Sequence, residues 1–290
     1  MADEGNTLLP GTVQEQNEKH QSMIHPTAIV DSHAELDTGV VVGPFTTIGP
    51  KVRIGKNTRI GGHAIITGHT AIGQDNVIHP FAFIGTEPQD VNYHGEDTRL
   101  VVGDGNTIRE FVTIAVATTK YDWVTKVGSH NMIMSYCHIA HDCDIGSGTV
   151  IANALSMSGH VKLEDGVAIG GIVGIHQFVT VGRFAFIGGL SRITQDVPPF
   201  LVTEGNHARA RCVNTVGLKR NNFDDARIQA IEDAFRALYL SDRPFNENLD
   251  ELERRPCLTD DVKYLIQFVR NAGVGFNFRS REAIRHKKKE

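Results

Sequence analysis

The chain has 290 residues, of which 40% are hydrophobic and 22% are charged, as in ordinary soluble globular proteins. Its formal net charge of −5 gives no global reason to expect a nucleic-acid partner, and no apolar run approaches the ~18 residues of a membrane-spanning helix. Glycine is plentiful, with 29 residues, whereas aromatic residues make up only 7%. This composition favours a fold made of many short strands and turns.

The beginning of the chain is polar. Residues 1–23 lack both the apolar core of a secretion signal and the arginines of an organelle transit peptide, and we interpret them as a disordered extension. Four cysteines follow without the paired spacing of a zinc site: Cys137, Cys143, Cys212 and Cys257. In a chain without a secretion signal, such scattered cysteines indicate reduced thiols, so we expect a cytoplasmic protein.

One repeat dominates the first two thirds of the chain. An aliphatic residue stands at every sixth position from Ile24 to Ile84, and the register resumes at Val102 and again at Val127, from which it runs to Ile193. An α-helix, with about 3.6 residues per turn, would scatter these side chains around its whole surface. A β-solenoid satisfies the period, because each hexad forms one short strand and a corner while its aliphatic residue points into the core.

Two interruptions break this register. We expect residues 85–101 and 115–126 to form loops on a β-solenoid that spans residues 24–197. Long loops that leave a regular scaffold often carry function. The Asp-Val-Pro-Pro sequence at residues 196–199 should end the strand pairing, because proline lacks an amide donor.

Helical patterns follow the solenoid, and we predict a helical C-terminal domain over residues 198–290. Asp224 or Asp225 can cap a helix with apolar residues on one face. Thr259 or Asp260 can cap another, and a shorter helix is expected between the two.

The repeat also predicts which residues stack in neighbouring coils. Residues about 18 positions apart lie above one another, so His141 should stack with Gly159 and Gln177. The same map gathers a patch, with Asp142 beside it, made of His138, His141, His160, His176 and Gln177.

This patch indicates direct acyl transfer. Histidine titrates near neutral pH and suits general-base work, and a neighbouring carboxylate can fix its tautomer. The amide of Gly159 is placed to donate to a developing oxyanion. The chain has no GxSxG elbow, and Cys143, which sits in a strand, is the less favoured nucleophile. We therefore expect His141 to take a proton from an acceptor hydroxyl or amine that attacks a thioester.

The stretch His138-Ile-Ala-His141-Asp142-Cys143 resembles the active-site motif of the acyl-[acyl-carrier-protein]–UDP-N-acetylglucosamine O-acyltransferases, which catalyse the first step of lipid A biosynthesis. Further family motifs follow in order, among them Gln195-Asp196-Val197-Pro198-Pro199 and Gly205-Asn206-His207-Ala208. The similarity covers about residues 24–285, whereas the hexads alone would indicate only the hexapeptide-repeat superfamily.

The resemblance implies a homotrimer of left-handed β-helices with active sites between subunits. His141 would be the base, Asp142 its support and Gly159 the oxyanion donor, and position 189 would limit the acyl length. The residues implied in substrate binding are Asp90, His138, His160, His176, Gln177, Gly189, Asn214, Lys219 and Arg220. The donor would be a 3-hydroxyacyl chain on the phosphopantetheine of acyl-carrier protein, which is acidic and would dock on basic residues of the C-terminal domain. The acceptor would be the 3-position of UDP-N-acetylglucosamine, and no metal or bound cofactor is implied.

This chain departs from the family pattern near the expected sugar site. Asn92 stands where the family usually has lysine, and Ala115-Val116-Ala117-Thr118 stands where it has His-Arg-Gly-Thr. Val216 replaces a glutamate and Asn221 an arginine. A second hypothesis is therefore a diverged paralogue that acylates another nucleotide sugar, such as a 3-amino sugar.

Three other interpretations stay open. A coenzyme-A-dependent hexapeptide acetyltransferase would need a small acyl pocket, whereas Gly189 leaves room for a long chain. A γ-class carbonic anhydrase would hold zinc with histidines from neighbouring subunits, and His138, His141 and His160 could serve that purpose. A non-catalytic solenoid would lose no turnover when His141 is replaced by alanine.

Overall fold

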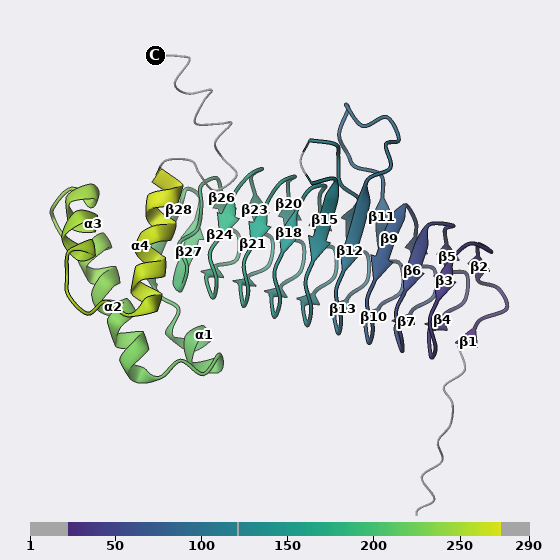
Figure 1. The fold of residues 1–290 in the computed structure, drawn as a ribbon, viewed down its shortest axis with the longest axis horizontal. Coiled ribbons are helices and arrows are strands. Elements are labelled where there is room, and N and C mark those ends of the chain that lie inside the picture. Colours follow the sequence, from purple (N-terminus) through teal and green to yellow (C-terminus); the bar gives the residue numbers. More distant parts are fainter. Residues whose placement is uncertain (1–22, 121, 274–290) are drawn as a thin grey trace, which may run out of the picture.

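The computed structural model describes residues 23–120 and 122–273, which form a long solenoid with helices at its C-terminal end (Figure 1). The extension predicted for residues 1–23 lies outside the described residues apart from Met23, and so do residues 274–290 of the predicted C-terminal domain. Within the described ranges, none of the helices combines the length and the apolar character needed to cross a membrane.

Three sheets of short strands form the walls of the solenoid, and the chain visits them in turn. The first sheet contains β1 (Met23–Ile24), β4 (Val41–Val42), β7 (Arg59–Ile60), β10 (Val77–Ile78), β13 (Thr107–Ile108), β16 (Met132–Ile133), β19 (Val150–Ile151), β22 (Ala168–Ile169), β25 (Phe186–Ile187), β27 (Leu201–Gly205) and β28 (Ala208–Val213). The second contains β2 (Ile29–Val30), β5 (Thr47–Ile48), β8 (Ile65–Ile66), β11 (Phe83–Thr86), β14 (Thr113–Ala115), β17 (His138–Ile139), β20 (Ser156–Met157), β23 (Gly174–Ile175) and β26 (Arg192–Ile193). The third contains β3 (Glu35–Leu36), β6 (Val52–Ile54), β9 (His69–Ile72), β12 (Arg99–Val102), β15 (Val124–Val127), β18 (Asp144–Ile145), β21 (Lys162–Leu163) and β24 (Thr180–Val181). The predicted β-solenoid is therefore confirmed.

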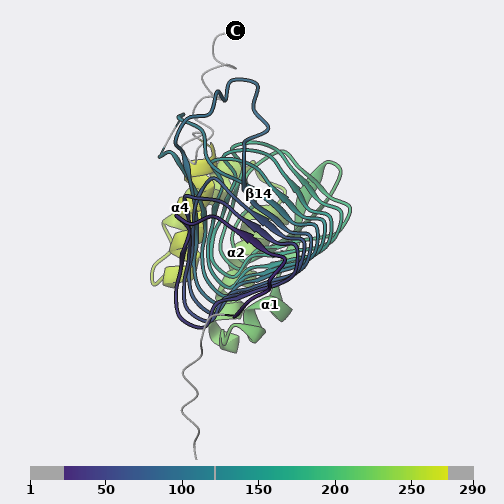
Figure 2. The same cartoon turned by 90° about the vertical axis from the view of Figure 1, so that its right-hand side faces the viewer.

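The spacing of paired residues follows the hexad rule and shows where it is interrupted. Ordinary neighbours in adjacent coils are 18 residues apart, as for Asn57 and Asp75. The step grows to 30 residues between Asn76 and Asn106, across the first loop, and to 25 residues between Asn106 and Asn131, across the second. Figure 2 shows both loops standing out from the same side of the stacked coils.

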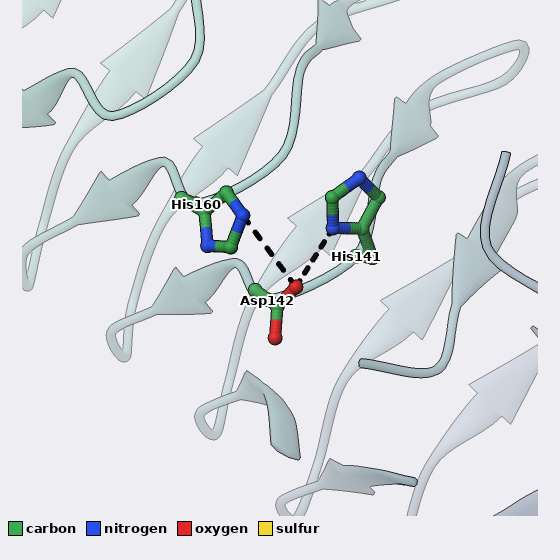
Figure 3. A group of neighbouring side chains, drawn as sticks. All are labelled: His141, Asp142 and His160. Carbon is green, nitrogen blue, oxygen red and sulfur yellow. Dashed lines mark hydrogen bonds and ion pairs between the residues drawn. The ribbon is translucent and has the colours of Figure 1, made fainter. Parts of the chain in front are cut away.

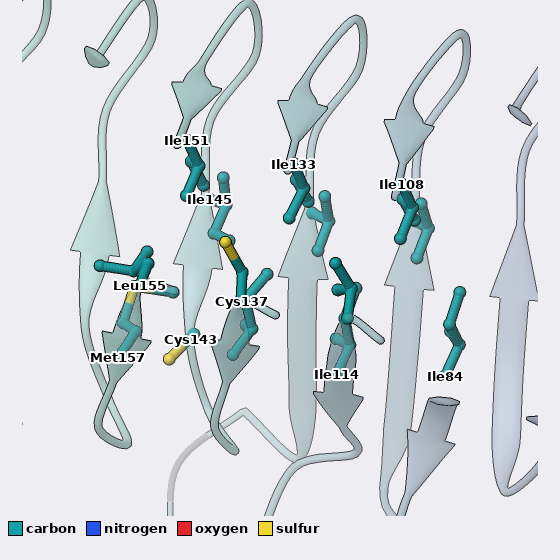
Figure 4. Close-up of a cluster of buried hydrophobic side chains, with 14 of the residues drawn as sticks. Ile84, Ile108, Ile114, Ile133, Cys137, Cys143, Ile145, Ile151, Leu155 and Met157 are labelled. Carbon is teal, nitrogen blue, oxygen red and sulfur yellow. The ribbon is translucent and has the colours of Figure 1, made fainter. Parts of the chain in front are cut away.

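The aliphatic residues of the repeat fill the interior. Figure 4 shows part of this core, in which Ile108, Ile114 and Ile133 are fully buried. Cys137 and Cys143 occupy positions in the same cluster. Truncating one of these isoleucines to alanine would remove contacts that neighbouring coils cannot replace, at a cost of about 2–5 kcal/mol.

A ladder of buried polar side chains runs beside this core. The Oδ1 atom of Asn76 accepts from the backbone and the side-chain amide of Asn106, both at 2.9 Å. Asn106 accepts in turn from the backbone of Asn131, and the Oγ1 of Thr149 donates to Asn131 at 2.8 Å. Buried amides at one corner of consecutive coils thus satisfy one another, as buried polar groups must.

The prediction that strand pairing ends at residues 196–199 is wrong. β27 pairs parallel with β25 and antiparallel with β28, so the first sheet gains a hairpin after Pro199. Phe200 takes a φ of +69°, which turns the chain back toward the sheet after the two prolines. The segment predicted as helical from residue 198 therefore begins with a hairpin, and its helices start at residue 215.

Up to residue 273, four helices follow the hairpin: α1 (Thr215–Arg220), α2 (Asp225–Tyr239), α3 (Phe245–Glu253) and α4 (Asp260–Gly273). The cap expected before α2 is confirmed, because the side chain of Asp224 accepts from the Arg227 amide at 2.8 Å. The hydroxyl of Thr259 accepts from the Val262 amide at 3.4 Å at the start of α4. Helix α3 is the shorter helix expected between them.

Polar and aromatic contacts join α4 to the last coils. The Tyr264 hydroxyl donates to the Glu164 carboxylate, and the Arg183 guanidinium lies 4.0 Å from the centre of the Tyr264 ring. Burial and then the hydrogen bond to Glu164 raise the pKa of Tyr264 above its ordinary value, so its hydroxyl keeps the proton that it donates. These contacts fix the helices against the solenoid end.

Candidate active site

His141 and Asp142 lie at the corner between β17 and β18, where the chain passes from the second sheet to the third. Asp142 has a φ of +59°, a conformation that aspartate tolerates better than most residues. The turn brings its Oδ2 atom to 2.7 Å from Nδ1 of His141. Because an ionised carboxylate only accepts, Nδ1 carries the proton in this bond and Nε2 is the basic nitrogen.

Three further contacts hold the Asp142 carboxylate (Figure 3 shows the first). Nε2 of His160 lies 3.7 Å from Oδ2. The backbone amide of Thr118 is 3.2 Å from both carboxylate oxygens, and its hydroxyl donates to Oδ2 at 2.6 Å. The backbone of Asp142 is held separately, because its amide donates to the hydroxyl of Thr125 at 2.9 Å. The carboxylate is therefore fixed from two coils and from the second loop.

Burial and hydrogen bonding act on Asp142 in opposite directions. Its side chain is 3% exposed, and that of His141 is 13% exposed. Burial raises the pKa of Asp142 and is the largest single influence, but the hydrogen bonds from His141 and Thr118 and the charge of His160 together outweigh it. The net effect is a pKa below the ordinary aspartate value, so Asp142 is ionised at neutral pH.

Gly159 lies directly against the His141 ring, as the stacking map predicts. A Cβ atom at this position would be 2.5 Å from Cε1 of His141 and 2.8 Å from Nε2. Among the described residues, the Gly159 amide donates to no backbone carbonyl, although its own carbonyl accepts from Phe178. The Gly159 amide is therefore a candidate oxyanion donor, at a residue that packs against the ring of the expected base.

The neighbouring histidines differ in their surroundings. His160 is buried, meets the His141 ring edge-on at 5.2 Å and stacks on Phe178 at 4.5 Å. His138 lies 2.7 Å from the Thr113 hydroxyl, and burial, followed by the charge of His141, lowers its pKa. His138 is therefore neutral near pH 7 and able to exchange hydrogen bonds with a substrate.

The exposed end of the patch consists of His176 and Gln177. Nδ1 of His176 donates to the Gln177 carbonyl at 3.3 Å. Both residues precede Phe178, whose amide pairs with Gly159 at 3.2 Å, so they continue the column of His141 and Gly159 by one coil. The structure thus places all the residues of the predicted patch on three consecutive coils, and their roles in binding stay predictions.

The remaining candidate residues lie elsewhere on the single chain. Gly189 follows β25 at the corner between the first and second sheets, not at the corner of His141. Asn214 caps α1, because its Oδ1 accepts from the Gly217 amide at 3.1 Å. Lys219 and Arg220 occupy the last turn of α1, with the ammonium of Lys219 3.4 Å from an oxygen of Asp225. In the described parts of the chain, no hydrogen bond or ion pair joins Asn214, Lys219 or Arg220 to His141.

The two loops meet at a separate ion pair. Nζ of Lys120, in the second loop, is 2.5 Å from Oδ2 of Asp90, in the first. Asn92 also donates to Asp90, from its backbone at 2.9 Å. The bond from Lys120, followed by that from Asn92, holds the pKa of Asp90 well below its usual range.

The alternative nucleophile is poorly placed. Cys143 is fully buried, and its thiol donates to the Ser158 carbonyl at 3.3 Å. Burial raises the pKa of this thiol to about 12, so it carries no thiolate at neutral pH. Cys143 lies just before β18 (Asp144–Ile145) and not in a strand as predicted, so its burial is what makes it a poor nucleophile.

The three side chains that converge here also form a possible ligand set for a metal ion. Donor atoms of His141, Asp142 and His160 all lie within 4.8 Å of one another. This set differs from the three histidines that a carbonic anhydrase would need, since His138 turns to Thr113 instead. A metal would also have to displace the short bond between His141 and Asp142, so the geometry favours a hydrogen-bonded base.

Sequence reasoning missed two threonines of this site. Thr118 holds the Asp142 carboxylate from the second loop, where the hexad register is broken and no stacking map applies, whereas Thr125 holds the Asp142 backbone from β15. The only signal was that Thr118 is the one residue that matches the family pattern in a stretch otherwise changed. Because a buried carboxylate needs hydrogen-bond donors, the loop beside Asp142 is where such donors are expected.

The β-helix of hexads and the oriented histidine beside a free amide define a hexapeptide-repeat acyltransferase. A family model described as UDP N-acetylglucosamine O-acyltransferase, domain 2, matches residues 196–277, and one described as bacterial transferase hexapeptide matches residues 125–154. The chain belongs to the acyl-[acyl-carrier-protein]–UDP-N-acetylglucosamine O-acyltransferase family, as similarity to its members shows.

Two relatives with that name illustrate the similarity. The protein of Herminiimonas arsenicoxydans is 50% identical over 226 residues, which cover 78% of this chain and 86% of the relative. That of Xylella fastidiosa is 48% identical over 255 residues, which cover 88% of this chain and 97% of the relative.

Solved structures agree with the fold. The UDP-N-acetylglucosamine acyltransferase of Campylobacter jejuni matches with a TM-score of 0.80 at 37% identity, over 85% of this chain and 95% of the other. The enzyme of the same name from Bacteroides fragilis matches with a TM-score of 0.83 at 34% identity, over 86% of this chain and 98% of the other. The solenoid is accordingly a left-handed β-helix, as the resemblance implied.

Proposed function

We propose that this enzyme transfers a 3-hydroxyacyl chain from acyl-carrier protein to the 3-hydroxyl of UDP-N-acetylglucosamine, the first step of lipid A biosynthesis, with His141 as general base. The observation that carries the mechanism is the 2.7 Å bond from Nδ1 of His141 to Asp142, which leaves Nε2 free beside the Gly159 amide. Membership of the family supports the choice of substrates.

His141, Asp142 and the Gly159 amide account for each proton transfer and for the charge that develops in the reaction. Nε2 of His141 takes the proton of the sugar hydroxyl as its oxygen attacks the thioester carbonyl. The resulting oxyanion accepts from the Gly159 amide, and the imidazolium is stabilised by ionised Asp142. When the carbon–sulfur bond breaks, His141 returns the proton to the departing phosphopantetheine thiol. The reaction uses the carrier's own phosphopantetheine, so the proposal includes no metal or bound cofactor.

The distribution of site residues supports a homotrimer with sites between subunits. One corner of the solenoid carries stacked rings of Phe45, His63, Phe81, Phe111 and Tyr136, with centroids 5.0–5.3 Å apart. Phe45 is 58% exposed and Tyr136 62% exposed, so this column is available to a second copy. A trimer could then bring Asn214, Lys219 and Arg220 to the patch of a neighbouring subunit. Light scattering would report three chains per particle, and a monomeric mass with full activity would contradict this arrangement.

The proposed function also implies a protein partner, acyl-carrier protein, and a cellular compartment, the cytoplasm. The basic end of α1, with Lys219 and Arg220, suits an acidic carrier protein. Four free cysteines, of which Cys137 and Cys143 are buried, fit a reducing cytoplasm.

A 3-amino nucleotide sugar is a second candidate acceptor. Ala115 and Val116 are buried and apolar where the family pattern has the longer polar side chains of histidine and arginine. These changed residues lie just before Thr118, which contacts Asp142, so the change lies close to the candidate active site.

One assay separates these candidates. The enzyme is incubated with 3-hydroxyacyl carrier protein, acetyl-carrier protein or acetyl-coenzyme A, and with UDP-N-acetylglucosamine or its 3-amino analogue, and products are resolved by mass spectrometry. The proposal predicts an ester formed from the long-chain carrier thioester and the hydroxyl sugar. An amide formed only from the amino sugar would establish the second candidate. Turnover of acetyl-coenzyme A alone would make the protein a small-chain acetyltransferase.

A further inference from the structure

The second loop enters the site through a single residue. Thr118 is 4% exposed, follows buried Ala117 and donates to Asp142 with both its amide and its hydroxyl. The loop base is itself anchored, because the Thr98 hydroxyl donates to the Ala117 carbonyl at 2.5 Å and the Ala117 amide donates to Arg99 at 3.3 Å. Thr118 is therefore held rigidly before any substrate binds.

The hydroxyl of Thr118 and the His141 ring share one acceptor atom. Both donate to Oδ2 of Asp142, at 2.6 and 2.7 Å. Two donors on the same oxygen, with the Thr118 amide between the two oxygens, leave the carboxylate no freedom to rotate. The direction of the bond to His141, and hence of its free Nε2, is then set from the loop.

We propose that Thr118 is a positioning residue for the catalytic pair, which fixes the carboxylate of Asp142 so that His141 keeps its Nδ1 proton and points Nε2 at the acceptor. This inference rests on the proposed role of His141. It assigns the second loop a function in catalysis beyond contact with substrate.

The other titratable groups around the pair do not duplicate this function. His160 lies farther from Oδ2, at 3.7 Å, and stacks on Phe178. His138 faces Thr113, and the thiol of Cys143 stays protonated. Lys120, two residues beyond Thr118, directs its ammonium to Asp90 instead. Thr118 is accordingly the neutral donor that tunes how strongly the carboxylate holds the imidazole proton.

Removing only the hydroxyl has a defined consequence. In Thr118→Val the carboxylate loses one donor, so its charge pairs more strongly with an imidazolium at position 141. The carboxylate is also free to rotate, so the His141 ring is less well oriented. Thr118→Ser keeps the donor, and Thr149→Val removes a buried threonine hydroxyl that bonds Asn131 in the core ladder rather than the site.

The test uses two readouts on the full-length protein with ¹⁵N-labelled histidine. The first needs no substrate: the Nδ1 proton of His141, assigned by its loss in His141→Ala, is followed by NMR through a pH titration. In Thr118→Val we expect this resonance to shift and to exchange faster with water, whereas Thr118→Ser and Thr149→Val should behave like the wild type. The second readout is acyl transfer, where Thr118→Val should lower kcat about 10–100-fold with unchanged KM and raise the acid limb of the pH profile.

The outcomes are distinct. A resonance and titration unchanged in Thr118→Val would overturn the inference, whatever the enzyme acylates. Equal losses in Thr118→Val and Thr149→Val without movement of the acid limb would reduce Thr118 to a structural role and also overturn it. A wild type that transfers no acyl chain would refute the proposed function alone, since the NMR titration still decides the role of Thr118.

Discussion

Replacing Gly159 by alanine tests the geometry of the site with the smallest possible change. The added Cβ would be 2.5 Å from Cε1 of His141, 2.8 Å from Nε2 and 3.0 Å from Nδ1. Carbon atoms in contact normally stand about 3.5 Å apart, so the ring must retreat by roughly 1 Å. A displacement of that size at a reacting group costs about 100-fold in rate, which corresponds to roughly 2.7 kcal/mol of activation free energy.

The assay is steady-state transfer of a 3-hydroxyacyl chain to UDP-N-acetylglucosamine, with kcat and both KM values, beside a thermal melt of each variant. Gly49→Ala is the matched control, because its Cβ would come no closer than 3.4 Å to a neighbour, the hydroxyl of Thr67. We expect kcat to fall about 100-fold in Gly159→Ala and to stay at the wild-type value in Gly49→Ala. A Gly159→Ala enzyme with wild-type kcat would refute the argument that the base lies against this amide.

Four further predictions concern single side chains. Asp142→Asn should lower kcat about 100-fold or more with little change in KM, because an amide no longer fixes the His141 tautomer; an unaltered kcat would contradict the role of the carboxylate. Cys143→Ala should keep kcat within about threefold, and loss of all turnover would restore the thiol as a nucleophile. Lys120→Met should raise KM for the nucleotide sugar more than it lowers kcat, since it releases Asp90 and the first loop; equal KM values would contradict this. The hydrogen bond from Arg109 lowers the pKa of Glu110 in the folded protein to about 2, below its unfolded value of about 4.3. Ionised Glu110 therefore stabilises the folded protein fully above about pH 4.3, and this stabilisation is lost as the pH falls toward 2. The melting-temperature difference between wild type and Glu110→Gln should therefore shrink between pH 6 and pH 3, and a constant difference would count against the assignment.

Much of the fold follows from one feature of the sequence. Aliphatic side chains at every sixth position can all be buried over so many residues only in a β-solenoid. The repeat and its two interruptions therefore predict the solenoid and its two loops from the sequence alone. The same arithmetic places Gly159 against His141, because stacking by 18 residues is a property of the backbone rather than of particular side chains. The helix that begins after Asp224 was likewise predictable from its cap.

The other features of the structure depend on contacts that the six-residue repeat does not specify. The hairpin of β27 and β28 follows two prolines, and local propensity gave no sign that the chain would turn back to the sheet. Thr118 is positioned by a loop whose path is fixed by its anchors at Thr98 and Arg99, distant from it in sequence. The expected roles of Asn214, Lys219 and Arg220 rest on the proposed trimer and stay predictions.

The most direct test of the central claim is turnover by His141→Ala with 3-hydroxyacyl carrier protein and UDP-N-acetylglucosamine. A thermal melt first checks that the variant melts at the same temperature as the wild type. Loss of a positioned general base should lower kcat by about 10²–10⁴-fold while the product of the residual reaction stays the 3-O-acyl sugar. Wild-type turnover in His141→Ala would contradict the account, because the Nε2 atom that the bond to Asp142 leaves basic would then be dispensable.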